Sequence, residues 1–417
     1  MKSAAPSPRN PERILVMSQF YYPDITAAAF RIKETVDLLV AKGYRVHVIA
    51  ARPHKAQIAG ERIDDGPVRV SRVPIIPYAG KGKWNYIAHY LSFMAAAVWA
   101  SWSHPSRFDI VWASSPPMFT GIAGWAVAKL KKAKLVLDVR DIWPDSAATT
   151  GQIRPDSLMY RLAKHAERWM YRVADRITCV AGPMARYIES YGVEAPAVVY
   201  NAIPRSYLEA AEAVSREVRP DSSADGPLTV AYVGNMGYCQ SLDIVVEAAA
   251  RLHAAGDRRV RFLLVGEGAE KARIAARIRE AGLDNVELRG AVPKTEALRI
   301  CASATALVLL LKDDGTMDKT IPSKVFDYLA AGRPILFGLQ GEAREILAAT
   351  GGNIPFDAGD PDSLAAALRK LLDELPRLTA AAAGHRDLVR ERFMRETMTD
   401  RLEAEFRKLL HDSGSGT

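Results

Sequence analysis

The sequence predicts an α/β protein of two domains, each with a Rossmann-like parallel sheet. Its 417 residues, 49% of them hydrophobic, are enough for two ordinary hydrophobic cores. Short apolar runs typical of buried strands alternate with helical periodicity along most of the chain. Glycines and polar side chains follow several of these runs. Ligands of open α/β sheets bind beyond the carboxyl ends of the strands, so these loops are the candidates for a functional site.

In the first half, seven apolar runs are expected to be strands, and helices connect them. The expected strands cover 13–19, 46–50, 69–77, 108–113, 134–139, 176–180 and 198–204. The expected helices cover 27–42, 84–102 and 157–173. No G-x-G-x-x-G pattern follows the first strand, which counts against a dehydrogenase. The densest polar cluster of this half, 140–146, follows a strand and therefore lies where a ligand is expected.

In the second half, glycines follow the first two expected strands. The strands are expected at 228–233, 261–265, 286–288, 305–311 and 335–337. Glycine lets the backbone approach a diphosphate closely. We therefore expect the turns after the first two strands to bind a phosphorylated ligand. Their candidate residues are Gly234, Asn235 and Gly237 in one turn and Gly266, Glu267 and Gly268 in the other.

The stretch 320–338 predicts a short helix followed by a strand, with Pro322 in the first turn and Gly332 at the end. The start of a helix carries free N–H groups and partial positive charge. Ser323 and Lys324 add a hydroxyl and a cation there, and Asp327 follows one turn later. These groups suit a nucleotide diphosphate, with amides and lysine on the phosphates and the carboxylate on the ribose. The alternative is an ordinary capped helix before a core strand.

Composition limits the class of protein and of partner. The net charge is +8, and the basic excess lies in residues 1–205. This asymmetry favours an anionic partner for the first half, such as a membrane surface, a phosphorylated lipid or nucleic acid. No zinc-finger or RNA-binding signature supports nucleic acid. Three widely spaced cysteines lack metal-ligand spacing and fit a reducing cytoplasm; they are Cys179, Cys239 and Cys301.

The segment 84–102 is long, apolar and rich in tryptophan and tyrosine. We expect a helix packed in the first domain. A helix whose aromatic edge touches the bilayer, aided by Lys81 and Lys83, is the second interpretation, and a membrane span is the third. No signal-peptide pattern is found, so export is not expected.

The residues 322–336, Pro-Ser-Lys-Val-Phe-Asp-Tyr-Leu-Ala-Ala-Gly-Arg-Pro-Ile-Leu, resemble the donor-site signature of family-4 retaining glycosyltransferases of the GT-B fold. The resemblance is greatest to the branch that builds bacterial O-antigens and capsules, which includes N-acetyl-fucosaminyl and fucosyl transferases. Arg140-Asp-Ile-Trp-Pro144 resembles the His-Asp-x-Trp-Pro segment of that family, and 289–293 resembles the segment that holds the nucleotide base.

The resemblance implies two domains facing a cleft, with a nucleotide-diphosphate sugar on the second domain and the acceptor on the first. It implies transfer with retention, no metal and no cofactor. Lys324, Arg140 and Asp141 are the implied catalytic groups. Arg140 is interpreted as a phosphate or oxyanion partner because guanidinium cannot act as a base at neutral pH; a structural Arg–Asp clamp is the alternative. Further donor contacts fall on Val292 and Pro293, and further acceptor contacts on Tyr22, Thr26 and Arg31.

The sequence departs from the family pattern at several positions. Asp327 and Lys319 replace the usual pair of glutamates, and Asp313, Asp314 or Asp318 could take the place of the first one. Asn235 and Gln240 lie near the places of an arginine and a lysine that clamp the pyrophosphate in relatives. Lys324 and the backbone amides then carry more of the phosphate binding.

We expect the following parts: a disordered tail over 1–11, an acceptor-binding domain over 12–205, and a nucleotide-sugar-binding domain over 206–385. A helix over 386–411 is expected to cross back to the first domain, and 412–417 to form a second disordered tail.

The predicted function is transfer of a sugar from a nucleotide-diphosphate sugar, expected to be UDP-linked, to a polyprenyl-diphosphate-linked saccharide. This would occur at the anionic inner face of the plasma membrane, in the synthesis of bacterial surface polysaccharide. A nucleotide-sugar 2-epimerase of the same fold and a non-catalytic nucleotide-sugar-binding protein are the alternatives. Arg140 in place of histidine argues against the epimerase, which needs acid–base side chains.

Overall fold

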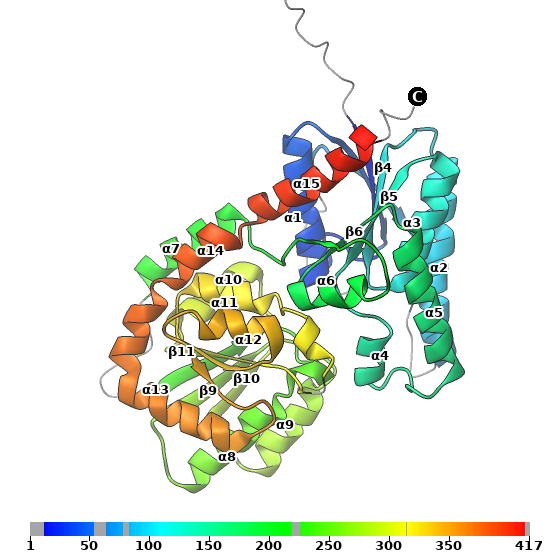
Figure 1. Cartoon of the computed structure of the whole chain (residues 1–417). Helices are drawn as coiled ribbons and strands as arrows, with labels where there is room; N and C mark the ends of the chain where they lie inside the picture. Colours follow the sequence, from blue (N-terminus) through cyan, green and yellow to red (C-terminus); the bar gives the residue numbers. More distant parts are fainter. Residues whose placement is uncertain (1–11, 54–63, 78–82, 219–225, 314, 413–417) are drawn as a thin grey trace, which may run out of the picture.

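The computed structural model describes residues 12–53, 64–77, 83–218, 226–313 and 315–412, and it contains two parallel sheets, one in each half of the chain (Figure 1). The predicted fold class is therefore confirmed. The expected tail over 1–11, residues 413–417 of the tail expected over 412–417, and also Lys81 and Asp314 lie outside the described residues, whereas Asp412 is the last residue of the final helix.

The first sheet has seven strands in the order β3-β2-β1-β4-β5-β6-β7. The strand order reverses between β1 and β4, which is where open α/β sheets bind their ligands. The strands are β1 (Arg13–Met17), β2 (Arg45–Ala51), β3 (Arg69–Val73), β4 (Ile110–Ser115), β5 (Lys134–Val139), β6 (Arg176–Cys179) and β7 (Ala197–Val198). The helices are α1 (Ala27–Ala41), α2 (Lys83–Ser103), α3 (Met118–Lys131), α4 (Asp145–Thr149), α5 (Leu158–Val173) and α6 (Gly182–Glu189).

In this half, one predicted strand is shorter than expected, and the helix expected over 84–102 is confirmed. The strand predicted over 198–204 ends at Val198, because the chain then turns toward the second sheet. The apolar segment 84–102 forms α2, which packs against α3. In the part of the chain that the structure describes, no helix is both long enough and apolar enough to cross a membrane.

The second sheet has six strands in the order β10-β9-β8-β11-β12-β13, with the reversal between β8 and β11. The strands are β8 (Leu228–Val233), β9 (Val260–Val265), β10 (Val286–Arg289), β11 (Ala306–Leu310), β12 (Ile335–Gly338) and β13 (Ile354–Pro355). The helices are α7 (Arg205–Glu217), η1 (Tyr238–Gln240), α8 (Asp243–Ala254), α9 (Lys271–Glu280), α10 (Lys294–Ser303), η2 (Met317–Lys319), α11 (Lys324–Ala331), α12 (Gly341–Ala348) and α13 (Pro361–Ala382). Helix α7 packs on α10 and α11 and so belongs with this sheet.

The stretch 386–411, predicted as one helix, forms two helices that meet at Phe393. Helix α14 (His385–Arg392) packs on α11 of the second half, whereas α15 (Arg395–Asp412) packs on α1, β6 and β7 of the first half (Figure 1). At the crossing, Ile203 N donates to Phe393 O at 3.2 Å and Arg395 N donates to Ile203 O at 2.8 Å. The two segments that connect the halves, one at Ile203 and one at Phe393–Arg395, are therefore hydrogen-bonded to each other.

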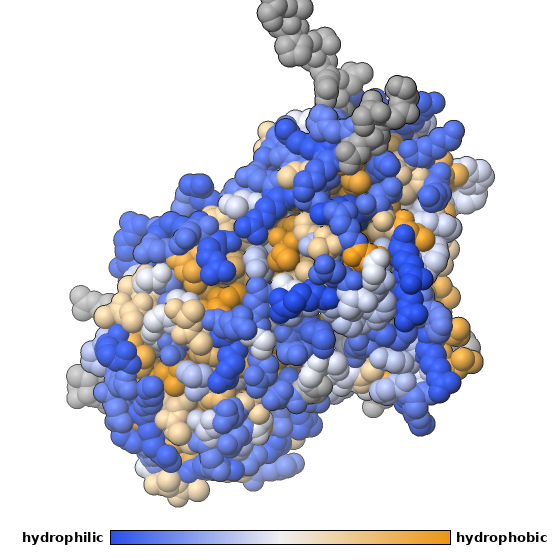
Figure 2. All heavy atoms as spheres, in the orientation of Figure 1, coloured by the Kyte–Doolittle hydropathy of each residue, from blue (hydrophilic) through white to orange (hydrophobic). Residues whose placement is uncertain are grey.

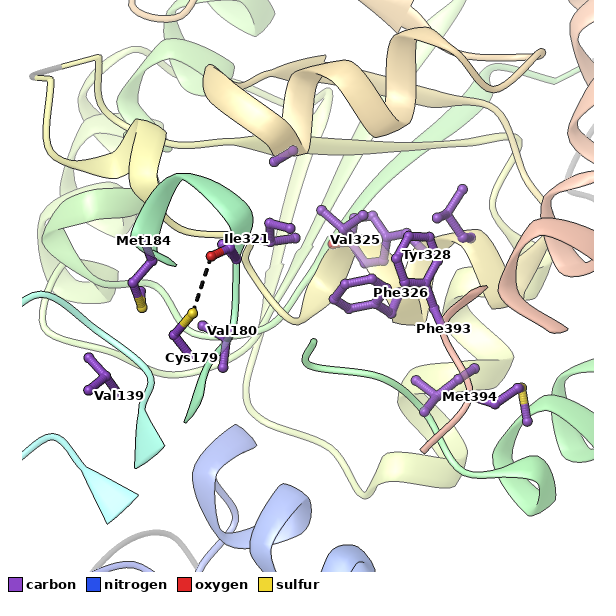
Figure 3. Close-up of a cluster of buried hydrophobic side chains, with 14 of the residues drawn as sticks. Val139, Cys179, Val180, Met184, Ile321, Val325, Phe326, Tyr328, Phe393 and Met394 are labelled. Carbon is purple, nitrogen blue, oxygen red and sulfur yellow. Dashed lines mark hydrogen bonds between the residues drawn. The ribbon is translucent and has the colours of Figure 1, made fainter. Parts of the chain in front are cut away.

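A continuous apolar core joins the two halves beneath this crossing (Figure 3). Phe393 is fully buried, and its ring centroid lies 4.9 Å from that of Phe326 in α11 and 5.4 Å from that of Tyr200. Figure 3 shows Cys179 and Val180 of the first half near Ile321 of the second. Burial of apolar surface common to both halves fixes their relative position.

Substituting Phe406 tests how α15 is held on the first half. This side chain is fully buried and meets Trp112 at 6.4 Å between ring centroids. We expect Phe406→Ala to lower the free energy of unfolding by about 3–5 kcal/mol, because it removes apolar contacts and leaves a cavity. Guanidinium unfolding followed by tryptophan fluorescence measures the loss. The exposed Arg401→Ala on the same helix is the control, and equal stability of the two variants would contradict the packing described.

Candidate active site between the two domains

The amino end of α11 opens into the space between the domains. Ser323 is the N-cap, its side chain makes no capping hydrogen bond, and Gly332 ends the helix at φ +66°. Pro322, expected in the first turn, instead precedes the N-cap, and the helix begins at Lys324, two residues after it. Among the described residues, no carbonyl or side chain accepts from the N–H groups of Ser323 and Lys324. Two donors and the positive end of the helix dipole are therefore left for a ligand.

Glycine turns bring the strand ends of the second sheet close to Lys324. Gly234, Gly266 and Gly268 have φ between +148° and +155°, a region that other residues rarely adopt. A Cβ on Gly234 would overlap the end of the Lys324 side chain, and a Cβ on Gly266 would overlap the carbonyl of Gly234. The Lys324 Nζ lies 5.3 Å from the centroid of the Tyr232 ring, so it is held above the first turn.

A cavity of about 540 Å³ lies against these turns, and residues of both domains line it. This volume is in the range of small-molecule sites. Eleven of the residues predicted from the sequence line it: Thr26, Arg31, Gly234, Asn235, Gly266, Glu267, Gly268, Val292, Ser323, Lys324 and Asp327. Gly237 and Pro293 stand just outside: Gly237 N donates to Gln240 Oε1 at 2.8 Å, and Pro293 is the N-cap of α10.

Asp327 presents a carboxylate to this cavity. No hydrogen bond to that carboxylate is found within the described parts of the chain. Burial raises its pKa, and Glu34 adds to the rise, while Lys294, Lys324 and Arg395 oppose it. A desolvated carboxylate without a hydrogen-bond donor is ready to accept one from a ligand hydroxyl.

A second cavity of about 450 Å³ adjoins the first, and both are lined by Ala27 and Ser323. Arg140 and Asp141 line this second cavity. Arg140 Nε donates to Ser114 Oγ at 2.7 Å and its Nη2 to Pro116 O at 3.2 Å. Burial lowers the pKa of Arg140 to about 10, so the guanidinium is still charged at neutral pH. Burial raises the pKa of Asp141, and hydrogen bonds with Ser146 and the Ile142 backbone lower it by a smaller amount.

Three of the predicted acceptor contacts, Tyr22, Thr26 and Arg31, lie away from this second cavity. Arg31 lines the first cavity, and its guanidinium is bound to the buried Asp138 at 2.5 and 3.1 Å. Burial opposes ionisation of Asp138, but the charge and hydrogen bonds of Arg31 outweigh it and lower the pKa. Tyr22 lines neither cavity, and its carbonyl accepts from Arg72 at 3.1 Å. Thr26 lines the first cavity and caps α1 through Ala29 N at 3.1 Å.

The structure also shows where the residues that depart from the family pattern lie. Lys319 lines neither cavity, and its Nζ donates to Gly315 O at 2.7 Å. Asp313 and Asp318 also stand outside the two cavities. Asn235 lines the first cavity and donates to Gln240, which lines the second, at 3.3 Å. Of the three aspartates considered as substitutes for the first glutamate, Asp313 and Asp318 therefore lie outside both cavities, and Asp314 is not among the described residues.

Sequence reasoning missed a charged group that bridges the domains beside Asp327. Glu34 of α1 accepts from Lys294 of α10 at 3.1 Å and from Arg395 of α15 at 3.2 Å. Lys294 Nζ also lies over the rings of Phe30 and Tyr207, at 4.8 and 4.6 Å from their centroids. These residues stand on helices with ordinary polar patterns. The one sequence signal for this charged group is the position of Lys294, directly after Val292-Pro293.

No group of three histidine, cysteine, aspartate or glutamate side chains in the described ranges is placed to hold a metal ion. The positive charge of the site comes from Lys324, Lys294, Arg395 and Arg140 and from the start of α11.

Arg31→Ala tests the ion pair beneath the site. The substitution leaves the Asp138 carboxylate buried without its cation, and we expect a loss of about 3–5 kcal/mol in the free energy of unfolding. Chemical denaturation measures it. Lys33→Ala, which breaks the exposed pair with Asp37 on the same helix, should change stability by about 0.5 kcal/mol or less. If Arg31→Ala keeps full stability and only weakens acceptor binding, the predicted acceptor role is right and the structural role is wrong.

Comparison with known proteins agrees with this architecture. The model of the Glycosyl transferase 4-like domain matches residues 26–203, and that of Glycosyl transferases group 1 matches residues 227–374. A curated relative from Escherichia coli K12, WcaI, whose name assigns it to colanic acid biosynthesis as a glycosyl transferase, is 26% identical over 77% of this chain and 81% of its own length.

Two solved structures show the same fold. HepE from Anabaena in complex with UDP and glucose has a TM-score of 0.69 at 14% identity, covering 95% of this chain and all of that one. Sucrose-phosphate synthase from Thermosynechococcus elongatus has a TM-score of 0.76 at 16% identity, covering 96% and 100%. The two domain models together match most of the chain, and the chain therefore belongs to the glycosyltransferases of the GT-B fold that combine these two domains.

Proposed function

We propose that this glycosyltransferase transfers a sugar from a UDP-sugar, with retention of configuration and without a metal, to a polyprenyl-diphosphate-linked saccharide of bacterial surface polysaccharide synthesis. The observation that carries the proposal is the convergence of the α11 amino end, Lys324 and the glycine turns on one side of the first cavity. The relative WcaI, named for colanic acid biosynthesis, and the UDP complex of HepE support the pathway and the donor nucleotide.

The first cavity suits the donor. The diphosphate would lie at Ser323 and Lys324, where two backbone N–H groups have no acceptor, and the Lys324 ammonium no ion-pair partner, among the described residues; the turn at Gly234 permits close approach. Asp327, one turn into α11, would accept hydrogen bonds from the ribose hydroxyls. The base would then lie toward Val292 and the turn at 266–268.

The second cavity suits the acceptor. It meets the first cavity at Ser323 and Ala27, so an acceptor hydroxyl there would face the sugar of a donor whose phosphates occupy the α11 end. We propose that the hydroxyl attacks on the face from which the diphosphate departs, and that a leaving phosphate oxygen takes its proton. Lys324, the helix amides and the charged Arg140 would stabilise the developing negative charge, which is the largest expected contribution to the rate. Asp141 would orient the acceptor.

Lys324→Ala is the direct test of the phosphate site. We expect kcat for transfer to fall about 10²–10³-fold, the usual effect of removing one preorganised charge-stabilising donor. Single-turnover transfer from UDP-glucose measures the fall, and circular dichroism checks that the fold is kept. The exposed Lys370→Ala in α13 is the matched control. Unchanged kinetics in the Lys324 variant would exclude its phosphate role.

Asp327→Asn tests the ribose contact. We expect the affinity for UDP-glucose to fall about 10–100-fold, the value of hydrogen bonds to a charged group. Loss of the 2′-hydroxyl from the donor should weaken binding to the native protein but not to the variant, as titration calorimetry can measure.

Because the pKa of Asp327 is raised, the affinity of the native protein should decrease as the pH falls through that raised value, and the affinity of the asparagine variant should not. A preference for the 2′-hydroxyl that survives in the variant would place the ribose elsewhere.

A further inference from the structure

Helices α2 and α3 enclose a groove on the outer side of the first domain. It is open, has a volume of about 450 Å³, and only apolar side chains line it. The two helices contribute matching series at four-residue spacing, so each series forms one stripe along its helix. The stripes are Met94, Val98 and Trp102 on α2 and Ile122, Ala126 and Leu130 on α3.

The α2 stripe of the groove extends to a residue that lines the second cavity of the site. Tyr90, four residues before Met94 on the same stripe, lines that cavity together with Trp143. The ring of Phe119, near the start of α3, lies between them, with ring centroids 6.2 Å from Tyr90 and 6.2 Å from Trp143. At 1.5 Å per residue, the path along α2 from Tyr90 to Trp102 is about 18 Å long. An apolar track thus leads from the acceptor side of the site to the surface.

The far end of the groove is unusually apolar for a protein surface. Trp99, Trp102 and Leu130 are 65%, 59% and 48% exposed, and the two indoles meet edge to face at 5.2 Å between centroids. Figure 2 shows hydrophobic residues reaching the surface along the edge of the first domain beside α2. Exposed patches of this kind mark contacts with protein, ligand or membrane, and tryptophan favours the bilayer interface.

The charges around the groove select among these partners. Trp125 of α3 meets Trp169 of α5 at 4.9 Å, so α5 flanks the groove. The basic residues of α3 and α5 are Lys129, Lys131, Arg161, Lys164, Arg168 and Arg172. The one acidic residue of α2, α3 and α5, Glu167, is buried and paired with Lys164 at 2.5 Å. An apolar track with a basic surround suits a lipid with an anionic head group.

We propose that the α2–α3 groove binds the hydrocarbon chain of the lipid-linked acceptor, whose diphosphate lies in the second cavity near Arg140. The chain runs from Tyr90 past Phe119 to the indoles of Trp99 and Trp102, where it enters the bilayer. This inference rests on the proposed transfer to a lipid-linked acceptor and adds where the lipid is held.

Photolabelling with geranylgeranyl diphosphate that carries a diazirine at the end of its chain tests the groove. In the native protein, mass spectrometry should find the label on peptides of α2 and α3. Ala126→Trp, which fills the groove, should reduce that labelling at least about 10-fold, since one indole occupies much of the space. Ala210→Trp, on an exposed position of α7, is the matched control and should label like the native protein.

Leu130→Glu at the exposed end provides a second variant that leaves the core intact, and it should reduce labelling because the chain would have to desolvate a carboxylate. Titration of all four proteins with UDP-glucose should give the same affinity.

Equal labelling of the Ala126 variant and the native protein would overturn the proposal. Labelling of the groove by a diazirine phosphatidylglycerol but not by the prenyl diphosphate would also overturn it, in favour of a membrane-lipid site. If the proposed function is wrong, UDP-glucose will not bind, while the prenyl label will still be found only in the groove. The two failures can therefore be told apart.

Discussion

The burial of α11 in a core common to both domains is the constraint on which the site depends. Phe326 packs against Phe393 at the point where the chain crosses back, and Val325 and Leu329 are fully buried beside it. The helix therefore cannot shift along its axis without opening apolar contacts of both halves. Its amino end, with Ser323 and Lys324, is fixed at the junction of the two cavities for that reason. A rigid, preorganised donor set is what electrostatic stabilisation of a leaving diphosphate requires.

The charged side chains around the first cavity are the second feature that shapes the site. Glu34 holds Lys294 and Arg395 from across the domain interface, while Lys324 and Asp327 face the same space, and no described residue donates a hydrogen bond to the Asp327 carboxylate. Below them, Asp138 neutralises Arg31 and accepts from Ser114 and Thr178 at 3.1 and 2.9 Å. Ser114 in turn accepts from Arg140. The same buried network thus joins the first cavity, which Arg31 lines, to the second cavity, which Arg140 lines.

The fold and half of the site follow from local patterns. Glycine after a strand, and Pro322 to Gly332 around a short helix, specify backbone conformations that adjacent residues alone determine, so the turns and α11 were predicted within a residue or two. Contacts made over long sequence distances were not predictable. Arg31 has no local sign that Asp138, 107 residues later, takes its guanidinium. Glu34, Lys294 and Arg395 come together only because α15 crosses between domains. The predicted helix over 386–411 breaks because Phe393 is needed in the core.

The most direct test of the central claim is a crystal structure of the protein with UDP-glucose. The account predicts the diphosphate within hydrogen-bonding distance of Ser323 N, Lys324 N and Lys324 Nζ, with the ribose against Asp327 and the sugar directed toward Ala27 and the second cavity. A nucleotide bound at the strand ends of the first sheet, or a diphosphate held away from the start of α11, would contradict it.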